Sequence, residues 1–117
     1  MSKKEVNVQK SLFDATKSST RAETVMDFLN AYTPATELQD VPGIGPAAAG
    51  ALQKAGCHTI QCLLGIYLTG VGHNTAPTDV CNKFFGYVKS LCPKANAHTV
   101  TFAISHLADH LNLYKYE

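Results

Sequence analysis

The fold is decided by the stretch Leu38-Gln-Asp-Val-Pro-Gly-Ile-Gly-Pro-Ala-Ala-Ala-Gly-Ala-Leu-Gln-Lys-Ala-Gly-Cys57, which predicts two helices joined by a tight turn. Gly43 and Gly45 permit such a turn and let the backbone approach another surface closely. Pro46 has the φ angle that suits a first helical position, and the alanine-rich helix after it is predicted to end at Gly56. This pattern is typical of a helix-hairpin-helix.

A helix-hairpin-helix over residues 36–56 predicts a site that binds nucleic acid backbones without reading bases. The N–H groups at the start of its second helix carry partial positive charge, and the glycine turn beside them leaves room for a phosphate. Ile44 is expected to point inward and to fix the turn to the core. Gly-x-Gly turns also join helices that bind no ligand, so a purely structural role is the alternative.

Outside this stretch, helical periodicity and turn residues predict a compact all-α bundle of five to six short helices, with no segment that alternates as a strand does. Residues 20–117 are expected to form one helical domain, a common size for a domain. Thr20 is a candidate N-cap for the first helix. The expected elements are helices at about 20–32, 36–40, 46–55, 58–68, 78–92 and 96–111, with a loop at 69–77.

Residues 1–19 predict a flexible basic N-terminal arm. Four lysines and two acidic residues give this segment a net charge of +2, which leaves −1 for the rest of a chain whose total is +1. Any electrostatic attraction to phosphate is therefore concentrated in the arm. A solubilising tail is the alternative interpretation.

Composition predicts a soluble protein that associates with a partner. Hydrophobic residues make up 45% of the chain, which argues against a disordered protein, and only 16% are charged, so we expect association to cover some apolar surface. No apolar run approaches the ~20 residues of a membrane helix, so no direct membrane insertion is expected. The cysteines form no Cys-x-x-Cys pair and follow no signal peptide, which favours reduced thiols in a cytosolic or nuclear compartment. They are Cys57, Cys62, Cys81 and Cys92.

Several short motifs recur in the same order and spacing as in a known family. They are Asp27-Phe28-Leu29, Gly43-Ile44-Gly45 with Leu52 and Gly56, Leu64-Gly65-x-Tyr67-Leu68, Phe84-x-x-Tyr87-Val88-x-x-x-Cys92, and Ala95-Asn96-Ala97. Over residues 20–111 the chain resembles the barrier-to-autointegration factor family, small chromatin proteins that bridge double-stranded DNA. The resemblance implies a helical homodimer in the nucleus and cytoplasm, or a viral equivalent, whose two DNA sites face apart.

The resemblance also implies a site, partners and a mode of control. Partners would be double-stranded DNA, bound through its phosphates, and LEM-domain proteins of the inner nuclear membrane. Phosphorylation at Ser18, Ser19 or Thr20, where the arm meets the first helix, would release DNA. The residues at positions of the family's DNA surface are Gly43, Ile44, Gly45, Ala47, Ala48, Ala51, Ala95, Ala97 and His98.

Departures from the family at three lysine positions, in one loop and at Tyr87, which replaces the family's Trp, leave two main functions open. Thr24, Ala51 and His98 stand where family members carry lysines that face phosphates, and the loop at 69–77 is longer. The chain is either a sequence-independent DNA-bridging dimer or a divergent adaptor with weak DNA affinity that acts through LEM-domain-like protein partners. A helix-hairpin-helix module of a repair complex is a third interpretation, although no nuclease or ligase is attached.

The sequence offers no strong candidate for catalysis, metal binding or a cofactor. His106 and His110 lie four residues apart on a predicted helix beside Asp109, but no cysteine stands at a spacing that completes four zinc ligands. Cys57-His58 adjacency does not place a base over a thiol, and no nucleophile elbow or phosphate-binding Gly-Lys-Ser loop is present. We therefore expect a non-enzyme without a metal or cofactor.

Overall fold

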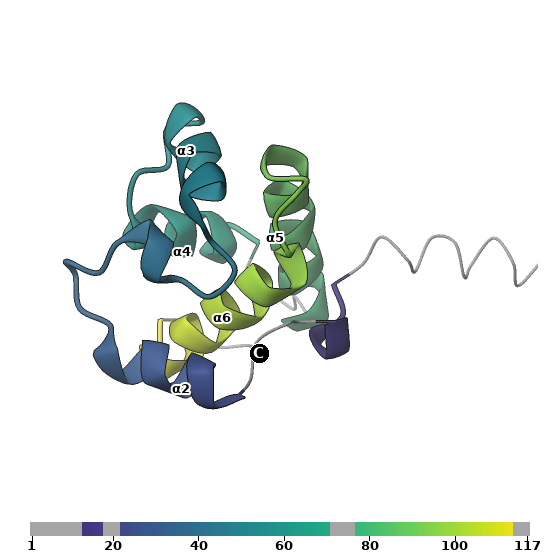
Figure 1. Ribbon diagram of the computed structural model, residues 1–117. Coiled ribbons are helices and arrows are strands. Elements are labelled where there is room, and N and C mark those ends of the chain that lie inside the picture. The colour runs from purple at the N-terminus through teal and green to yellow at the C-terminus, as the bar shows by residue number, and fades with distance from the viewer. Residues whose placement is uncertain (1–12, 18–21, 71–76, 114–117) are drawn as a thin grey trace, which may run out of the picture.

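A computed structural model describes residues 13–17, 22–70 and 77–113, and in these ranges the chain is all-helical, as the sequence predicts (Figure 1). Five α-helices and two 3-10 helices occur there, with no strand. The predicted arm up to residue 12, the middle of the predicted loop, and Ser18, Ser19 and Thr20 lie outside the described residues. The elements are η1 (Ala15–Lys17), α2 (Ala22–Ala31), η2 (Leu38–Asp40), α3 (Pro46–Lys54), α4 (Ile60–Leu68), α5 (Pro77–Leu91) and α6 (Ala97–His110).

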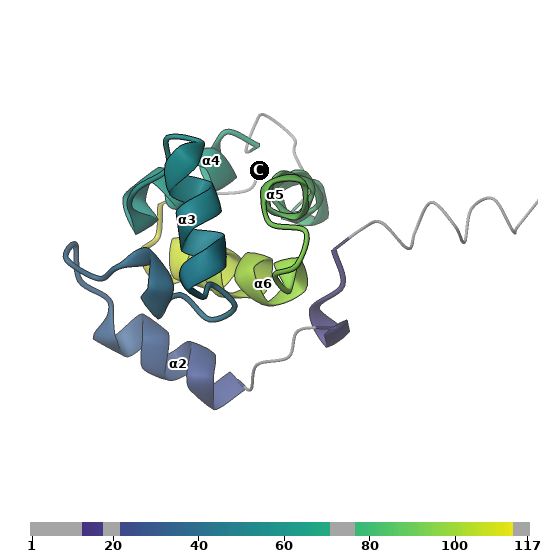
Figure 2. The same cartoon turned by 45° about the horizontal axis from the view of Figure 1, so that its top comes forward.

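Helix α6 is the centre of the fold. It packs against α2, α4, α5 and η1, and Figures 1 and 2 show α2 on one side of it and α3, α4 and α5 on the other. A helix enclosed in this way must be apolar or small-sided over most of its surface. Its buried residues are Ala97, Thr99, Val100, Thr101, Ala103, Ile104, Leu107 and Ala108.

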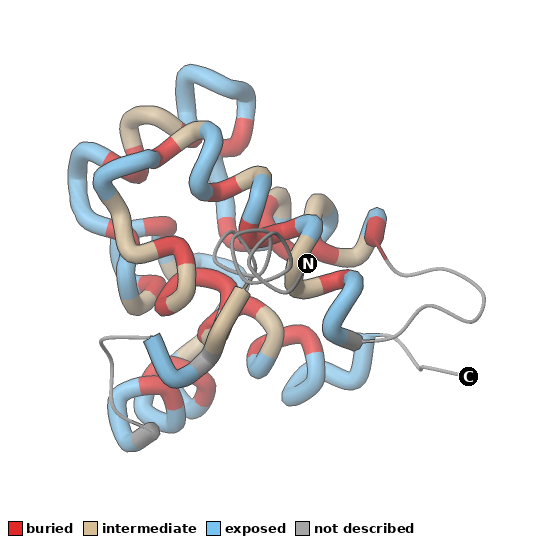
Figure 3. The backbone as a smooth tube through the Cα atoms, turned by 90° about the vertical axis from the view of Figure 1, so that its right-hand side faces the viewer, coloured by how far each residue is buried: buried red, intermediate tan, exposed pale blue. Residues whose placement is uncertain are grey.

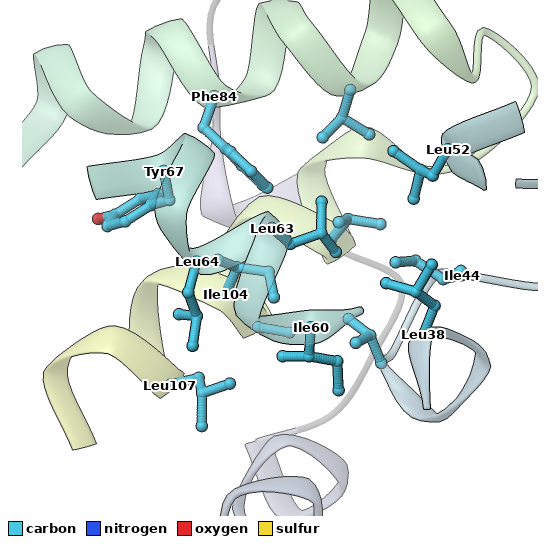
Figure 4. Packing of buried hydrophobic residues seen from close by; sticks show 14 of the residues in the cluster. Leu38, Ile44, Leu52, Ile60, Leu63, Leu64, Tyr67, Phe84, Ile104 and Leu107 are labelled. Carbon is cyan, nitrogen blue, oxygen red and sulfur yellow. The ribbon is translucent and has the colours of Figure 1, made fainter. Parts of the chain in front are cut away.

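One face of each surrounding helix contributes to a single hydrophobic core. Buried and exposed positions recur along the helices at helical spacing, which Figure 3 shows as repeated changes of colour along the tube. Leu52 of α3, Leu63 of α4 and Ile104 of α6 all belong to this core (Figure 4). The rings of Tyr67 and Phe84 pack edge to face with their centroids 5.6 Å apart.

Local capping sets the ends of the helices. Gly56 has a φ of +92°, and the N–H groups of Gly56 and Cys57 donate to the carbonyls of Gln53 and Leu52, at 3.0 and 2.8 Å. This is the Schellman arrangement that ends a helix, so the predicted stop at Gly56 is confirmed. At the start of α4, the Thr59 hydroxyl accepts from the N–H of Cys62.

All four cysteines are free thiols. Burial raises the pKa of the Cys57 thiol to about 12, and it also raises the pKa values of Cys81 and Cys92. These three thiols are therefore protonated at neutral pH and are poor nucleophiles. Across the described ranges, none of the helices combines the length and the apolar character needed to cross a bilayer.

Candidate functional site

The predicted glycine turn is present, but the helix before it is shorter than expected. Where a short helix is expected over 36–40, the chain forms only η2, a single turn of 3-10 helix over Leu38–Asp40. The N–H of Glu37 donates to the Asp40 carboxylate at 3.1 Å, and the N–H of Ile44 donates to the carbonyl of Val41 at 3.0 Å. The structure thus supplies the turn and the second helix, while the helix-hairpin-helix itself stays a prediction.

The two glycines of the turn have different roles. Gly43 has a φ of +92°, and a Cβ built on it lies 2.9 Å from Cγ2 of Val100 and 3.1 Å from Thr99. The surface that this glycine approaches is therefore helix α6 of the same chain. Gly45 is the N-cap of α3 with a φ of −98°, and a Cβ there meets nothing within 4 Å. Ile44 between them is buried, as predicted, and fixes the turn to the core.

The turn and the first half of α3 face the end of α5 and the α5–α6 connection across a groove of about 590 Å³. It brings together six of the nine residues predicted for the site, from two segments that are distant in sequence. These six are Gly43, Gly45, Ala47, Ala48, Ala51 and Ala95. The opposite wall adds Leu91, Cys92, Pro93, Lys94 and Asn96, which sequence reasoning did not place in the site.

Two helices begin at this groove. Helix α3 starts without a side-chain cap, because its N-cap is Gly45, so the N–H groups of Ala47 and Ala48 have no intrahelical acceptor. Helix α6 starts at Asn96, whose side-chain oxygen accepts from the N–H of Thr99 at 3.2 Å. The partial positive charges of both helix starts therefore lie along one groove.

The side chains that line the groove are small and mostly apolar. Lys94 is the one Lys, Arg, Asp or Glu among them, and it is exposed. The Cys92 thiol donates to the Ala48 carbonyl at 3.7 Å, a buried contact that joins the two walls of the groove. One feature of the sequence could have indicated that Lys94 belongs to the site, namely its position two residues before Asn96, the N-cap of α6. Thr24, on α2, is exposed but does not line the groove.

Three predicted site residues, Ala48, Ala97 and His98, offer the groove less than expected, whereas Ile44 is buried as predicted. Ile44 and Ala97 are 5% and 4% exposed, so their side chains are closed off from any ligand. Ala48 lines the groove but is only 8% exposed. His98 does not line the groove, and its ring packs on Phe85 with the centroids 4.5 Å apart. The interpretation of His98 as a residue that faces phosphate is therefore not supported by its position.

The two histidines considered for metal binding, His106 and His110, are not grouped with further ligands among the described residues. The ring of His106 packs on Phe102 with the centroids 4.3 Å apart, and its Nδ1 lies 2.9 Å from the Phe102 carbonyl. His110 is exposed at the last position of α6. In the part of the chain that the structure describes, no three His, Cys, Asp or Glu residues are grouped so that they could hold a metal ion.

Comparisons with models of protein families, with curated proteins and with solved structures find no match to this chain.

Proposed function

We propose that this protein binds double-stranded DNA through its phosphates, without reading the base sequence, and that a dimer of it bridges two duplexes. The observation that carries the proposal is the meeting of two helix starts in one groove. Backbone N–H groups at a helix start are general donors to phosphate oxygens. The resemblance to the barrier-to-autointegration factor family, with its nuclear and cytoplasmic location or a viral equivalent, points the same way.

Small residues on the groove walls favour contact through the backbone. Gly43, Gly45, Ala47, Ala51 and Ala95 carry no side chain beyond a methyl group. A phosphate can therefore approach the main chain without displacing a long side chain. Contacts of this kind fix position on the duplex and carry no sequence information, in keeping with binding that is independent of sequence.

The charge of the groove sets the expected strength of binding. Each lysine that pairs with a phosphate releases counterions, whereas a neutral N–H donor releases almost none. With Lys94 as the charged side chain of the groove, the dependence of affinity on salt should be shallow. The four lysines within residues 1–19 are a further source of positive charge.

Titration of a duplex of mixed sequence at several salt concentrations tests the proposal. We expect weak binding with a log–log salt slope of about −1 to −2, and a slope steeper by about one unit for Ala51→Lys, because this change adds one lysine to the groove wall. Ala35→Lys is the matched control, since Ala35 is exposed outside the groove. Deletion of residues 1–12, which keeps residues 13–17 and their contacts with α5 and α6, measures what the rest of the arm contributes.

An adaptor that acts through protein partners is the second candidate, and the apolar lining of the groove favours it. Leu91, Cys92 and Pro93 form one wall and alanines the other, a composition suited to covering by a protein surface. If neither the parent nor Ala51→Lys binds duplex at low salt, or if Ala51→Lys gains no more than Ala35→Lys, the adaptor function replaces DNA binding. Titration with a LEM domain then becomes the positive test.

Bridging requires two sites, and we expect light scattering to give about twice 12.6 kDa. Phe84 of α5 is 2% exposed and belongs to the core, so an interface on this helix must use its neighbours. Ile66 of α4 and Tyr87 of α5 are only partly buried, so their exposed parts could contact a second subunit. Ile66→Asp should give a monomer, and Met26→Asp, at an exposed position on α2, should not. A monomeric parent at micromolar concentration would contradict bridging and leave single-duplex binding standing.

A further inference from the structure

The segment from Phe13 to Lys17, expected to belong to a flexible arm, is docked on helices α5 and α6. The N–H of Phe13 donates to Oδ1 of Asn82 at 3.1 Å, and the N–H of Asp14 donates to Nδ1 of His98 at 3.0 Å. The side-chain amide of Asn96 donates to the Lys17 carbonyl at 3.3 Å. Figure 2 shows η1 beside the start of α6. Three polar contacts thus hold a segment of five residues.

Aromatic packing strengthens the same contact. The Phe13 ring lies with its centroid 6.1 Å from that of His98 and 6.5 Å from that of Phe85. His98 itself packs on Phe85, so the three rings form one cluster. The imidazole is therefore both a packing surface and a hydrogen-bond acceptor for the docked segment.

The hydrogen bond from Asp14 requires a particular protonation state of His98. A backbone N–H is always a donor, so Nδ1 of His98 must be unprotonated and the neutral ring must carry its proton on Nε2. An imidazolium has donors at both nitrogens and no acceptor. Protonation would therefore place an N–H donor on each of the two nitrogens, the backbone N of Asp14 and Nδ1 of His98, which lie 3.0 Å apart. The two donors would repel each other.

We propose that His98 is a pH-sensitive latch that holds residues 13–17 on the α5–α6 surface while its ring is neutral and releases them when the ring is protonated. The latch does not depend on DNA binding. The docked segment is connected to the groove through Asn96, which lines the groove and donates a hydrogen bond to the Lys17 carbonyl. Release of the segment therefore removes one hydrogen bond from a groove residue.

The groups around His98 favour the neutral ring. Burial of the ring is the largest cause that lowers the pKa of His98 from its ordinary value of 6.5. Lys17 of the docked segment and Lys89 of α5 lower it further, and Asp14 opposes them. The Asp14 carboxylate accepts instead from the hydroxyl and N–H of Thr16, at 2.7 and 3.0 Å.

The sign of the pH dependence follows from this shift. A histidine with a lower pKa in the docked state contributes its full stabilisation above the pKa of the detached state, near 6.5. The stabilisation falls as the pH decreases below that value, because the detached ring takes up a proton first. The segment should therefore be docked at neutral pH and released in mild acid.

Nuclear magnetic resonance of the full chain tests the latch, with ¹⁵N relaxation for residues 13–17 and ¹⁵N shifts for the His98 ring. At about pH 7.5 we expect amide order parameters near 0.85 and a ring protonated at Nε2, and at about pH 5 order parameters below about 0.6 in the segment alone. The pH at which half of the order in residues 13–17 is lost should coincide with the midpoint of the His98 titration followed by its ring ¹⁵N shifts.

Two substitutions of His98 separate its charge from its shape. His98→Asn keeps an acceptor at the δ position that does not titrate, so the segment should stay ordered at both pH values. His98→Phe keeps a ring without an acceptor, so order should be lost at both. His106→Asn, on the same helix but outside the cluster, should behave as the parent does. A segment that remains ordered after His98 is protonated, or an acid release that persists in His98→Asn, overturns the proposal.

Discussion

Alanine at Gly43 is expected to lower the free energy of unfolding by about 2–4 kcal/mol, since it combines backbone strain with a steric clash. The φ of +92° is one that side chains rarely adopt, and the new Cβ would lie 2.9 Å from Cγ2 of Val100. Val100 is fully buried in α6 and has little freedom to move. Urea denaturation followed by circular dichroism measures the loss.

Gly45→Ala is the matched control for this change. It places the same methyl group two residues along the chain, where φ is −98° and nothing lies within 4 Å. The cost there should be only about 1 kcal/mol, because alanine is a poorer N-cap than glycine but meets neither backbone strain nor a steric clash at this position. Equal destabilisation by the two variants would mean that the turn does not pack against α6 as described.

Glutamate at Gly45 is expected to reduce affinity for duplex DNA by about tenfold or more while the fold is retained. Gly45 lines the groove at the start of α3, so a carboxylate there would compete with phosphate for the free N–H groups of that helix. The same carboxylate interacts favourably with the helix dipole, and a Cβ at this position meets open space, so stability should change little.

Gly45→Gln separates charge from size in that experiment. It adds a side chain of nearly the same volume without a negative charge, and we expect a smaller loss of affinity than with glutamate. Binding is measured by fluorescence anisotropy at low salt, where electrostatic effects are least screened. If the glutamate variant is folded and binds as tightly as the parent, the groove is not the DNA site.

The helices could be predicted from the sequence because their signals are local. Helices α2 to α6 lie within a few residues of the predicted ranges, since apolar periodicity, Pro46 and Gly56 act through neighbours on the same helix. The helix expected at 36–40 was the exception. The chain forms only the three-residue 3-10 helix η2 there. A sequence pattern of so few residues does not distinguish a 3-10 helix from an α-helix.

The candidate site could be predicted only in part. The turn from Gly43 to Ala48 can be predicted because its residues are contiguous in the sequence. The sequence does not, however, distinguish the roles of its two glycines. The two glycines differ only through tertiary packing. Gly43 packs against Val100 and Thr99 and has no room for a Cβ, whereas Gly45 has room for one. The same limit hid Lys94, because its place on the groove depends on how the α5–α6 connection lies against α3.

The sequence by itself determined the all-α class, the helices and the inward position of Ile44, because these depend on residues close together along the chain. Only the tertiary structure decided that Phe13–Lys17 is docked and that His98 faces this segment and does not line the groove. Those contacts join residues 69 and 84 positions apart. No local pattern specifies such a pair, since it forms only after α5 and α6 have packed and set Asn82 and His98 on one surface.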